Sequence, residues 1–258
     1  MRIAALSDFH IGARHHTDGF RHDLARFARF LDRLEAEHDT IVLLGDIYQT
    51  DHSLWPTEGA ARRMLERARR RVAVLAERFA APPYVHVFGN HDAIAGPALG
   101  APEHLRLPGR FPALFIHGHQ FDPIAVEARW AAELGTWSTG RLRAVGMRPL
   151  AWWLELRDVA IKDRRFRGPD GPYARGALGL MREHGAPIVV MGHTHCPGIT
   201  PLSRGAMANT GTCSGGRTMW VSIDTERGTI EVHGVGAPMH HALPDALARG
   251  PSGAHGGT

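Results

Sequence analysis

The chain has 258 residues, of which 43% are hydrophobic and 22% are charged, and its formal net charge is +4. That length is enough to bury a sizeable core, as one large domain or as one domain with an insert. Two cysteines, Cys196 and Cys213, exclude a disulfide framework, and no apolar run approaches the ~20 residues of a membrane-spanning helix. We therefore expect a cytoplasmic protein that is at most peripheral to a membrane.

Nearly all of the basic charge is arginine, and Lys162 is the only lysine. Two interpretations of this bias stay open. It can reflect the composition of the source genome, or it can indicate an anionic partner such as a phosphate group or a membrane surface, because guanidinium groups bind phosphate through two parallel hydrogen bonds.

Short apolar runs alternate with amphipathic ones along the chain. The first three quarters of the chain predict strands and helices in the order strand 2–8, helix 20–37, strand 40–46, helix 56–80, and strands 84–90, 112–118 and 187–193. Three further β-rich runs follow at 205–211, 218–224 and 228–235. This order favours an α/β fold with more than one sheet.

Two segments differ from this pattern, and they divide the chain into a main domain over residues 1–236, an insert and a tail. Residues of about 122–180 are helical in pattern and rich in Trp and Arg, which predicts a helical cap inserted between two strands. The cap either packs on itself or forms an apolar trough for lipid chains, in which case Arg141, Arg148 and Trp152 would bind substrate. Residues 237–258 predict a disordered tail.

Polar side chains follow five of the predicted strands, at the point where each strand ends. In chain order they are Asp8 and His10; Asp46; Asn90, His91 and Asp92; His117 and His119; and His193 and His195. In open α/β sheets, ligands bind at the carboxyl ends of the strands. Carboxylate, amide and imidazole donors suit Mn²⁺, Fe or Zn²⁺, and the set is too large for one tetrahedral ion, so it predicts two ions.

The ordered motifs DFH, GDIYQ, GNHD, HGH and GHTH, spread over residues 8–195, resemble those of the calcineurin-like metallophosphoesterase superfamily. The resemblance implies an α/β fold of the four-layer α/β/β/α sandwich type, here with the helical cap insert. It also implies two divalent metal ions, with Mn²⁺ first and Fe or Zn²⁺ as alternatives, and hydrolysis of a phosphodiester or pyrophosphate bond by a hydroxide that bridges them.

The same resemblance implies roles for individual residues. One metal would be held by Asp8, His10 and His195, the second by Asn90, His117 and His193, and Asp46 would bridge the two. His91 would stay off the metals and protonate the leaving oxygen, and Asp92 would orient His91. His119 is either a loop residue or a contact to a metal ligand or to phosphate, and Asp122 either orients a ligand histidine or caps the next helix.

The helical insert between HGH and GHTH is similar to that of UDP-2,3-diacylglucosamine hydrolases, which cleave a lipid-linked nucleotide with Mn²⁺ at the inner membrane face. The chain departs from that group, which often has Arg where this chain has His91, and HGD where it has HGH. A phosphatase or phosphodiesterase acting on a soluble small molecule or on nucleic acid is the alternative, although no specific nucleic-acid site is expected. A metal-free scaffold with this fold is an alternative of another class.

Overall fold

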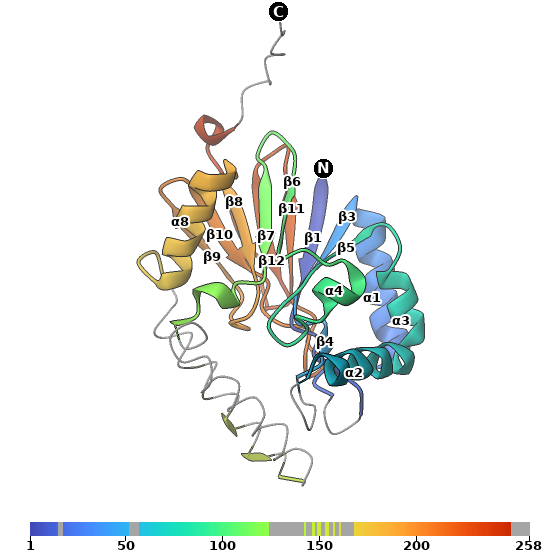
Figure 1. Ribbon diagram of the computed structural model, residues 1–258. Coiled ribbons are helices and arrows are strands. Elements are labelled where there is room, and N and C mark those ends of the chain that lie inside the picture. Colours follow the sequence, from blue (N-terminus) through green and yellow to red (C-terminus); the bar gives the residue numbers. More distant parts are fainter. Residues whose placement is uncertain are drawn as a thin grey trace, which may run out of the picture.

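Two β-sheets packed face to face form the centre of this computed structural model, which describes residues 1–14, 18–51, 57–123, 168–248 and separate positions between 142 and 160 (Figure 1). One sheet has the strand order β13 (Met239–Ala242), β12 (Thr229–His233), β11 (Trp220–Asp224), β1 (Arg2–Leu6), β3 (Thr40–Leu44) and β5 (Tyr84–Val87). The other has the order β6 (His104–Leu107), β7 (Ala113–Ile116), β8 (Ile188–Met191), β10 (Gly205–Asn209) and β9 (Gly198–Leu202).

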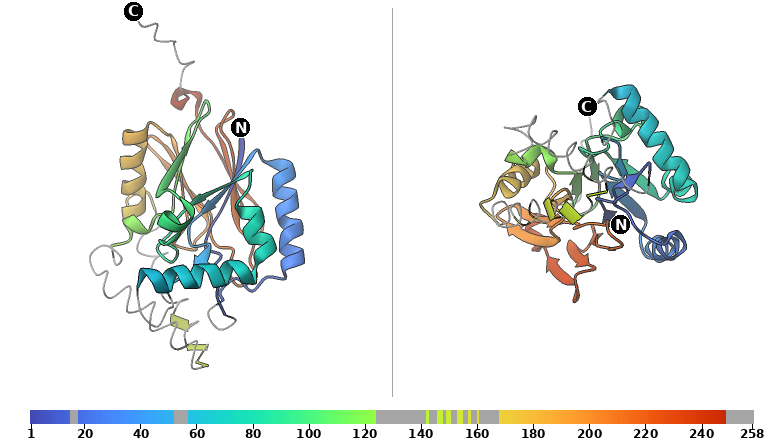
Figure 2. Two further views of the ribbon diagram at one scale, coloured as in Figure 1. Left: turned by 45° about the vertical axis from the view of Figure 1, so that its right-hand side comes forward. Right: turned by 90° about the horizontal axis from the view of Figure 1, so that it is seen from below.

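Helices cover the outer face of each sheet, as the two views of Figure 2 show. The first sheet carries α1 (Leu24–Glu37) and α3 (Ala73–Phe79), and the second carries α8 (Pro172–His184), whereas α2 (Glu58–Arg71) lies across the lower edge in Figure 1. A short helix, α4 (Ala95–Leu99), follows β5, and a small ribbon pairs β2 (Ile11–Gly12) with β4 (Tyr48–Gln49). The fold is therefore the expected α/β/β/α arrangement of sheets flanked by helices.

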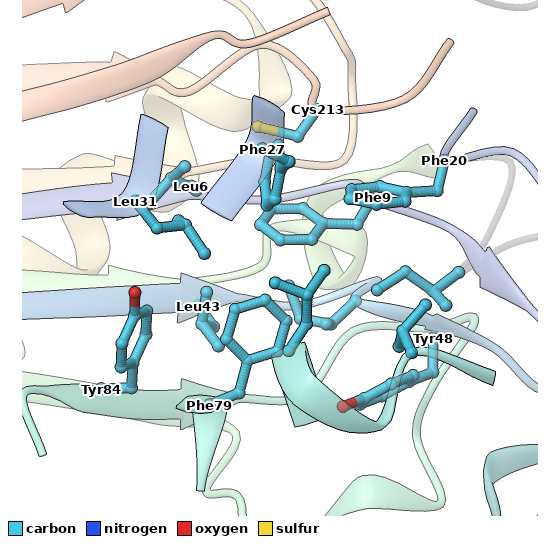
Figure 3. Packing of buried hydrophobic residues seen from close by; sticks show 14 of the residues in the cluster. Leu6, Phe9, Phe20, Phe27, Leu31, Leu43, Tyr48, Phe79, Tyr84 and Cys213 are labelled. Atoms are coloured by element: carbon cyan, nitrogen blue, oxygen red, sulfur yellow. The ribbon is translucent and has the colours of Figure 1, made fainter. Parts of the chain in front are cut away.

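Alternation of side chains along the strands produces the three apolar layers between these four layers of structure. In β1, Ala4 and Leu6 face the helices, whereas Ile3 and Ala5 face the second sheet. The cluster on the helix side is rich in aromatic rings and includes Phe9, Phe20, Phe27 and Phe79 (Figure 3). Both faces of the central strands are buried, so their sequences are continuous apolar runs.

Strand direction brings the predicted ligands to one edge. The strands β1, β3 and β5 are parallel to one another, and so are β7, β8 and β10. In Figure 1, β1 runs from the N-terminus, in the upper half of the picture, towards the lower edge of the sheet. Because parallel strands end on the same side, the residues after β1, β3 and β5 are neighbours in space.

Helix α1 begins where the sequence indicates a cap. Asp23 has an extended backbone and its side chain accepts a hydrogen bond from the Arg26 N–H, so it satisfies a donor that the first turn would otherwise leave unpaired. Phe27, Phe30 and Leu34 form its buried stripe. Burial of each such side chain contributes about 1.5–3 kcal/mol, which holds the helix against the sheet.

Three expectations about the elements need correction. The helix predicted over 56–80 is two helices, because Val72 leaves helical geometry (φ −118°, ψ 43°) between α2 and α3. Part of the expected tail is ordered: β13 pairs with β12, and Leu243 is buried. Helix α8 begins inside the expected cap boundaries, yet it packs on the second sheet as part of the main domain. Most of the expected cap lies outside the described residues.

Candidate metal centre

Backbone strain marks the edge where the strands end. Five non-glycine residues there have left-handed backbones with φ between 52° and 64°: Asp8, His10, Asp46, His193 and His195. A left-handed conformation costs an L-residue roughly 1–2 kcal/mol, and such strain is concentrated at functional sites. All five belong to the ligand set predicted from the sequence.

Asp8, His10 and His195 form the first cluster. His195 Nε2 lies 3.1 Å from Asp8 Oδ1 and 3.2 Å from His10 Nε2. His10 Nδ1 lies 2.8 Å from Gln49 Oε1, an acceptor that fixes its ring and turns Nε2 towards the cluster. Asp8 is fully buried, and its carboxylate also contacts the Ser7 hydroxyl and accepts the His193 backbone N–H.

Asp46, His117 and His193 form the second cluster. His117 Nδ1 donates to the Leu44 carbonyl at 2.8 Å, which leaves His117 Nε2 facing Asp46 Oδ2 at 3.1 Å. His193 Nε2 lies 3.0 Å from Asp122 Oδ2. In each of the two clusters, the potential ligand atoms lie within 4.8 Å of one another. The same holds for a third group of His10, Asp46 and His91, which shares His10 with the first cluster and Asp46 with the second. Asp46 therefore lies between two potential metal positions.

Buried polar atoms without partners test whether these residues suit metal ions. Asn90 Oδ1 and His119 Nδ1 are buried and have no hydrogen-bond partner among the described residues. His117 Nε2 is also buried and makes no hydrogen bond of acceptable geometry, although Asp46 faces it. An orphaned buried acceptor costs about 1–3 kcal/mol, and a cation bound there would offset that cost. The donor set fits divalent metal ions.

The electrostatics give Asp8 and His10 the protonation states that bind metal, whereas His117 carries a proton that a metal ion would displace. Burial alone would raise the pKa of Asp8, but the positive charge of His195 lowers it far below its usual range. Burial, reinforced by His91, lowers the pKa of His10 to about 3, so this imidazole is neutral. Burial would lower the pKa of His117, but Asp46 raises it to about 9. A proton on His117 then occupies the place that a metal ion would take, since metal binding displaces ligand protons.

Glycine is required where the strand-end loops meet. Gly45 has φ +79°, and a Cβ atom there would lie 2.5 Å from His117 Nδ1. A Cβ atom on Gly89 would overlap the Asp46 carboxylate. The backbones can approach this closely only without side chains, which explains the Gly in the GD and GNHD motifs.

His91 lies beside the group that links the two clusters. Its Nδ1 is 2.6 Å from Asp51 Oδ2, its Nε2 is 3.9 Å from Asp46 Oδ2, and its backbone N–H donates to Asp46 Oδ1 at 2.8 Å. The Gln49 amide spans from His10 Nδ1 on one side to the Asp51 carboxylate on the other. Gln49 and Asp51 thus connect a metal-ligand candidate with His91.

The structure gives Asp92 a different set of contacts from the expected one. Its buried carboxylate accepts four backbone N–H groups, those of Asp46 (3.1 Å) and Gly89 (2.7 Å) on Oδ1, and those of Ile47 (2.8 Å) and Tyr48 (3.2 Å) on Oδ2. The carboxylate at His91 Nδ1 is that of Asp51. The orienting role expected of Asp92 therefore passes to Asp51, and Asp92 holds the two ligand loops together.

The remaining expectations have separate outcomes. Asp122 contacts His193, in agreement with the first of its two alternatives, and the helix that it would cap in the second lies outside the described residues. Burial lowers the pKa of His119 to about 4, and its ring lies 5.6 Å from that of His117, so it is part of the centre's wall. Arg141, Arg148 and Trp152 lie outside the described residues. The sequence contained one indication of the missed contacts, because Gln49 closes the GDIYQ motif.

Comparison with known proteins identifies the family of the chain. Residues 1–197 match the family described as "Calcineurin-like phosphoesterase". The chain therefore belongs to the calcineurin-like phosphoesterase family. No curated protein matches it, and no described helix is long and apolar enough to cross a membrane.

Solved structures with a similar chain path share little sequence with it. A predicted phosphoesterase from Streptococcus pneumoniae is 16% identical (TM-score 0.45; 94% of this chain and 97% of that one). Zinc-complexed Vps29 from Entamoeba histolytica is 16% identical (TM-score 0.48; 94% and 98%), and the phosphoesterase Yfce from E. coli is 17% identical (TM-score 0.44; 95% and 100%).

Proposed function

We propose that the protein is a dinuclear-metal phosphoesterase that hydrolyses a phosphodiester or pyrophosphate bond. The observation that carries the proposal is the overlap of the potential ligand groups around Asp46, with one cluster on each side of it. Asp8, His10 and His195 would hold one ion, Asn90, His117 and His193 would hold the other, and Asp46 would contact both. When bound, two such ions supply positive charge for the phosphoryl oxygens and lower the pKa of a water nucleophile.

The chain's own residues supply the proton and its positioning. His91 Nε2 faces the centre and is the group that would protonate the leaving oxygen. Asp51 Oδ2 accepts from Nδ1 and keeps the ring in that orientation. The Gln49 amide connects the Asp51 carboxylate to His10, so that one hydrogen-bond network orients both the proton donor and a metal ligand.

The finer substrate assignment rests on the resemblance of the insert. UDP-2,3-diacylglucosamine, or a related lipid-linked nucleotide, remains our specific candidate, and peripheral contact with the inner membrane face is part of the same hypothesis. Mn²⁺ is the metal we expect first, because carboxylate, amide and imidazole donors without thiolate suit it. A soluble phosphoester is the alternative substrate.

Hydrolysis assays with a matched variant test the proposal. Purified protein with Mn²⁺ is assayed on a bis-aryl phosphodiester, an aryl monoester and UDP-2,3-diacylglucosamine, and bound metal is measured. Asp46→Asn should remove most of the activity and lower the bound metal below two ions per chain, because it weakens the shared ligand. Asp245→Asn is the control, because this exposed carboxylate pairs with Arg110.

The outcomes separate the alternatives. Release of UMP by the wild-type chain supports the lipid-linked nucleotide, whereas cleavage of the aryl esters alone keeps the chemistry and rejects that substrate. A wild-type protein that binds metal, but whose hydrolysis of each phosphoester is no faster than that of Asp46→Asn, would favour a non-catalytic scaffold.

A further inference from the structure

A groove of about 750 Å³ lies along α1 from its N-terminus to Arg33 and is lined on another side by the loop at Gly216 and Thr218. Four arginines line it: Arg21, Arg26, Arg29 and Arg33. Three of them occur at positions i, i+3 and i+7 of α1, so they share one face of the helix. We call this feature the arginine groove.

The positive charge of the arginine groove is not balanced by its acidic residues. None of the four guanidinium groups forms an ion pair with a carboxylate of the described residues. Asp23 accepts the Arg26 backbone N–H as the cap of α1, and Asp32 pairs with Arg78 at 2.7 Å. Uncompensated cations gathered in a concave site favour an anionic ligand.

Arg21 is held in an unusual conformation at the end of the groove. Its φ of 54° makes it the sixth described non-glycine residue with a left-handed backbone, and the other five are candidate metal ligands. The segment around it is fixed by Gly215 N–H to the Gly19 carbonyl (2.7 Å), Gly216 N–H to the Phe20 carbonyl (3.1 Å), and His22 Nε2 to the Cys213 carbonyl (2.9 Å). The fold thus maintains a strained arginine at the groove, as it maintains strained ligands at the centre.

One end of the arginine groove, at Arg21 and Arg26, lies at the same edge of the sheet as the metal centre. Because α1 connects the parallel strands β1 and β3, it must begin at their carboxyl edge. The Gly19 N–H donates to the His10 carbonyl at 2.9 Å, and the Cys213 N–H donates to the Ser7 carbonyl at 3.1 Å. Both walls of the groove therefore continue from the loops that carry Asp8 and His10.

We propose that the arginine groove binds a further phosphoryl group of the substrate, which is then a small molecule with more than one phosphoryl group. This inference rests on the proposed function, in which the metal centre holds the reacting phosphoryl group. The groove's volume lies within the ~300–1,000 Å³ range of small-molecule sites, and arginine binds phosphoryl oxygens through its paired donors.

The aromatic residues at the groove argue against single-stranded nucleic acid as the ligand. Sites for single strands present exposed rings on which bases stack. Phe27 and Phe30 line the groove but are only 1% and 6% exposed. Phe27 packs beneath it against Phe20 and Phe9 (Figure 3), with ring centroids 4.8 Å and 5.5 Å away.

A charge-matched pair of variants tests the proposal. The groove variant combines Arg21→Asn, Arg26→Gln and Arg33→Gln, in which Asn tolerates the left-handed backbone. The control variant combines Arg63→Gln, Arg67→Gln and Arg182→Gln, which neutralise three exposed arginines elsewhere. Binding of inorganic tripolyphosphate is measured by calorimetry, and kcat/KM is measured on a bis-aryl phosphodiester, which has one phosphoryl group.

We expect the groove variant to bind tripolyphosphate at least about tenfold more weakly than the wild-type and control chains, with kcat/KM on the aryl ester and the melting temperature unchanged. Equal binding by all three proteins, or an equal loss in the control, would overturn the proposal. So would loss of binding to a single-stranded oligonucleotide or to anionic phospholipid vesicles without a change in tripolyphosphate binding. If no chain hydrolyses the aryl ester but the tenfold loss is found, the proposed function fails while the anion site stands.

Discussion

Replacing Asp92 by Asn separates its role in stability from a role in catalysis. The Asp92 carboxylate accepts two backbone N–H groups on each oxygen, from Asp46 and Gly89 on one and from Ile47 and Tyr48 on the other. An asparagine side chain has one acceptor oxygen and a donor in place of the second. At least two buried N–H groups would then lose their acceptor and face another donor.

The cost follows from those two lost bonds. A hydrogen bond to a charged group contributes about 1.5–3 kcal/mol, so two such bonds predict a loss of about 3–6 kcal/mol in the free energy of unfolding. Total stabilities of about 5–15 kcal/mol are typical, so the variant should be close to unfolding. Urea denaturation followed by circular dichroism measures this loss from the midpoint and the slope.

Asp23→Asn is the matched control, because Asp23 also accepts a backbone N–H but is an exposed helix cap. Asn and Asp are nearly equal as caps, so its unfolding free energy should be almost unchanged. A loss below about 1 kcal/mol in Asp92→Asn, less than one charged hydrogen bond contributes, would refute the four-bond assignment. Unchanged stability together with a large fall in kcat would restore the expected role of Asp92 as the partner of His91.

Three further predictions concern other parts of the molecule. Asp51→Asn should lower kcat by about 10–100-fold with little change in bound metal or melting temperature, and equal loss of metal and activity would contradict a positioning role. His86→Phe should reduce the loss of stability between pH 6.5 and 4. Burial, then the charge of Arg69, lowers the pKa of His86 from 6.5 to about 4 in the folded chain. The unfolded chain therefore takes up the proton at a higher pH, and the wild type loses about 2–3 kcal/mol of unfolding free energy over this range. Urea midpoints that fall equally with pH in both chains would refute this. Chelation of metal should lower the melting temperature of the wild type, since an ion at 100 times its Kd stabilises by about 2.7 kcal/mol, and should affect Asp46→Asn less.

The central strands could be predicted from the sequence, whereas three outer strands of the main sheets could not. Both faces of β1, β3 and β8 are buried, which produces the apolar runs that predict them. The missed strands β6, β9 and β13 all lie at sheet edges. An edge strand needs no such run, and β9 even contains Pro201, a residue that argues against a central strand.

The break between α2 and α3 also could not be predicted from the sequence. The apolar stripe continues through Val72, Leu75 and Phe79, all of which are buried, and no Gly or Pro marks a boundary. The Val72 N–H is shared between the Ala68 and Arg69 carbonyls. The chain can therefore change direction there while every apolar side chain still reaches the core, so periodicity alone predicts one helix.

The assignment of Asp92 and Asp51 shows which part of a site a sequence pattern can supply. The ligand candidates follow strand ends, and parallel strands bring those ends together, so their proximity could be predicted from the order of the elements. The partner of His91 depends on contacts between loops that lie 40 residues apart. Asp92 is adjacent to His91 in sequence, but its carboxylate is turned into the loops after β3 and β5, where four backbone donors need an acceptor. Those donors converge on the Asp92 carboxylate because Gly45 and Gly89 allow the loops to approach closely. That packing determines which aspartate is left to orient the histidine.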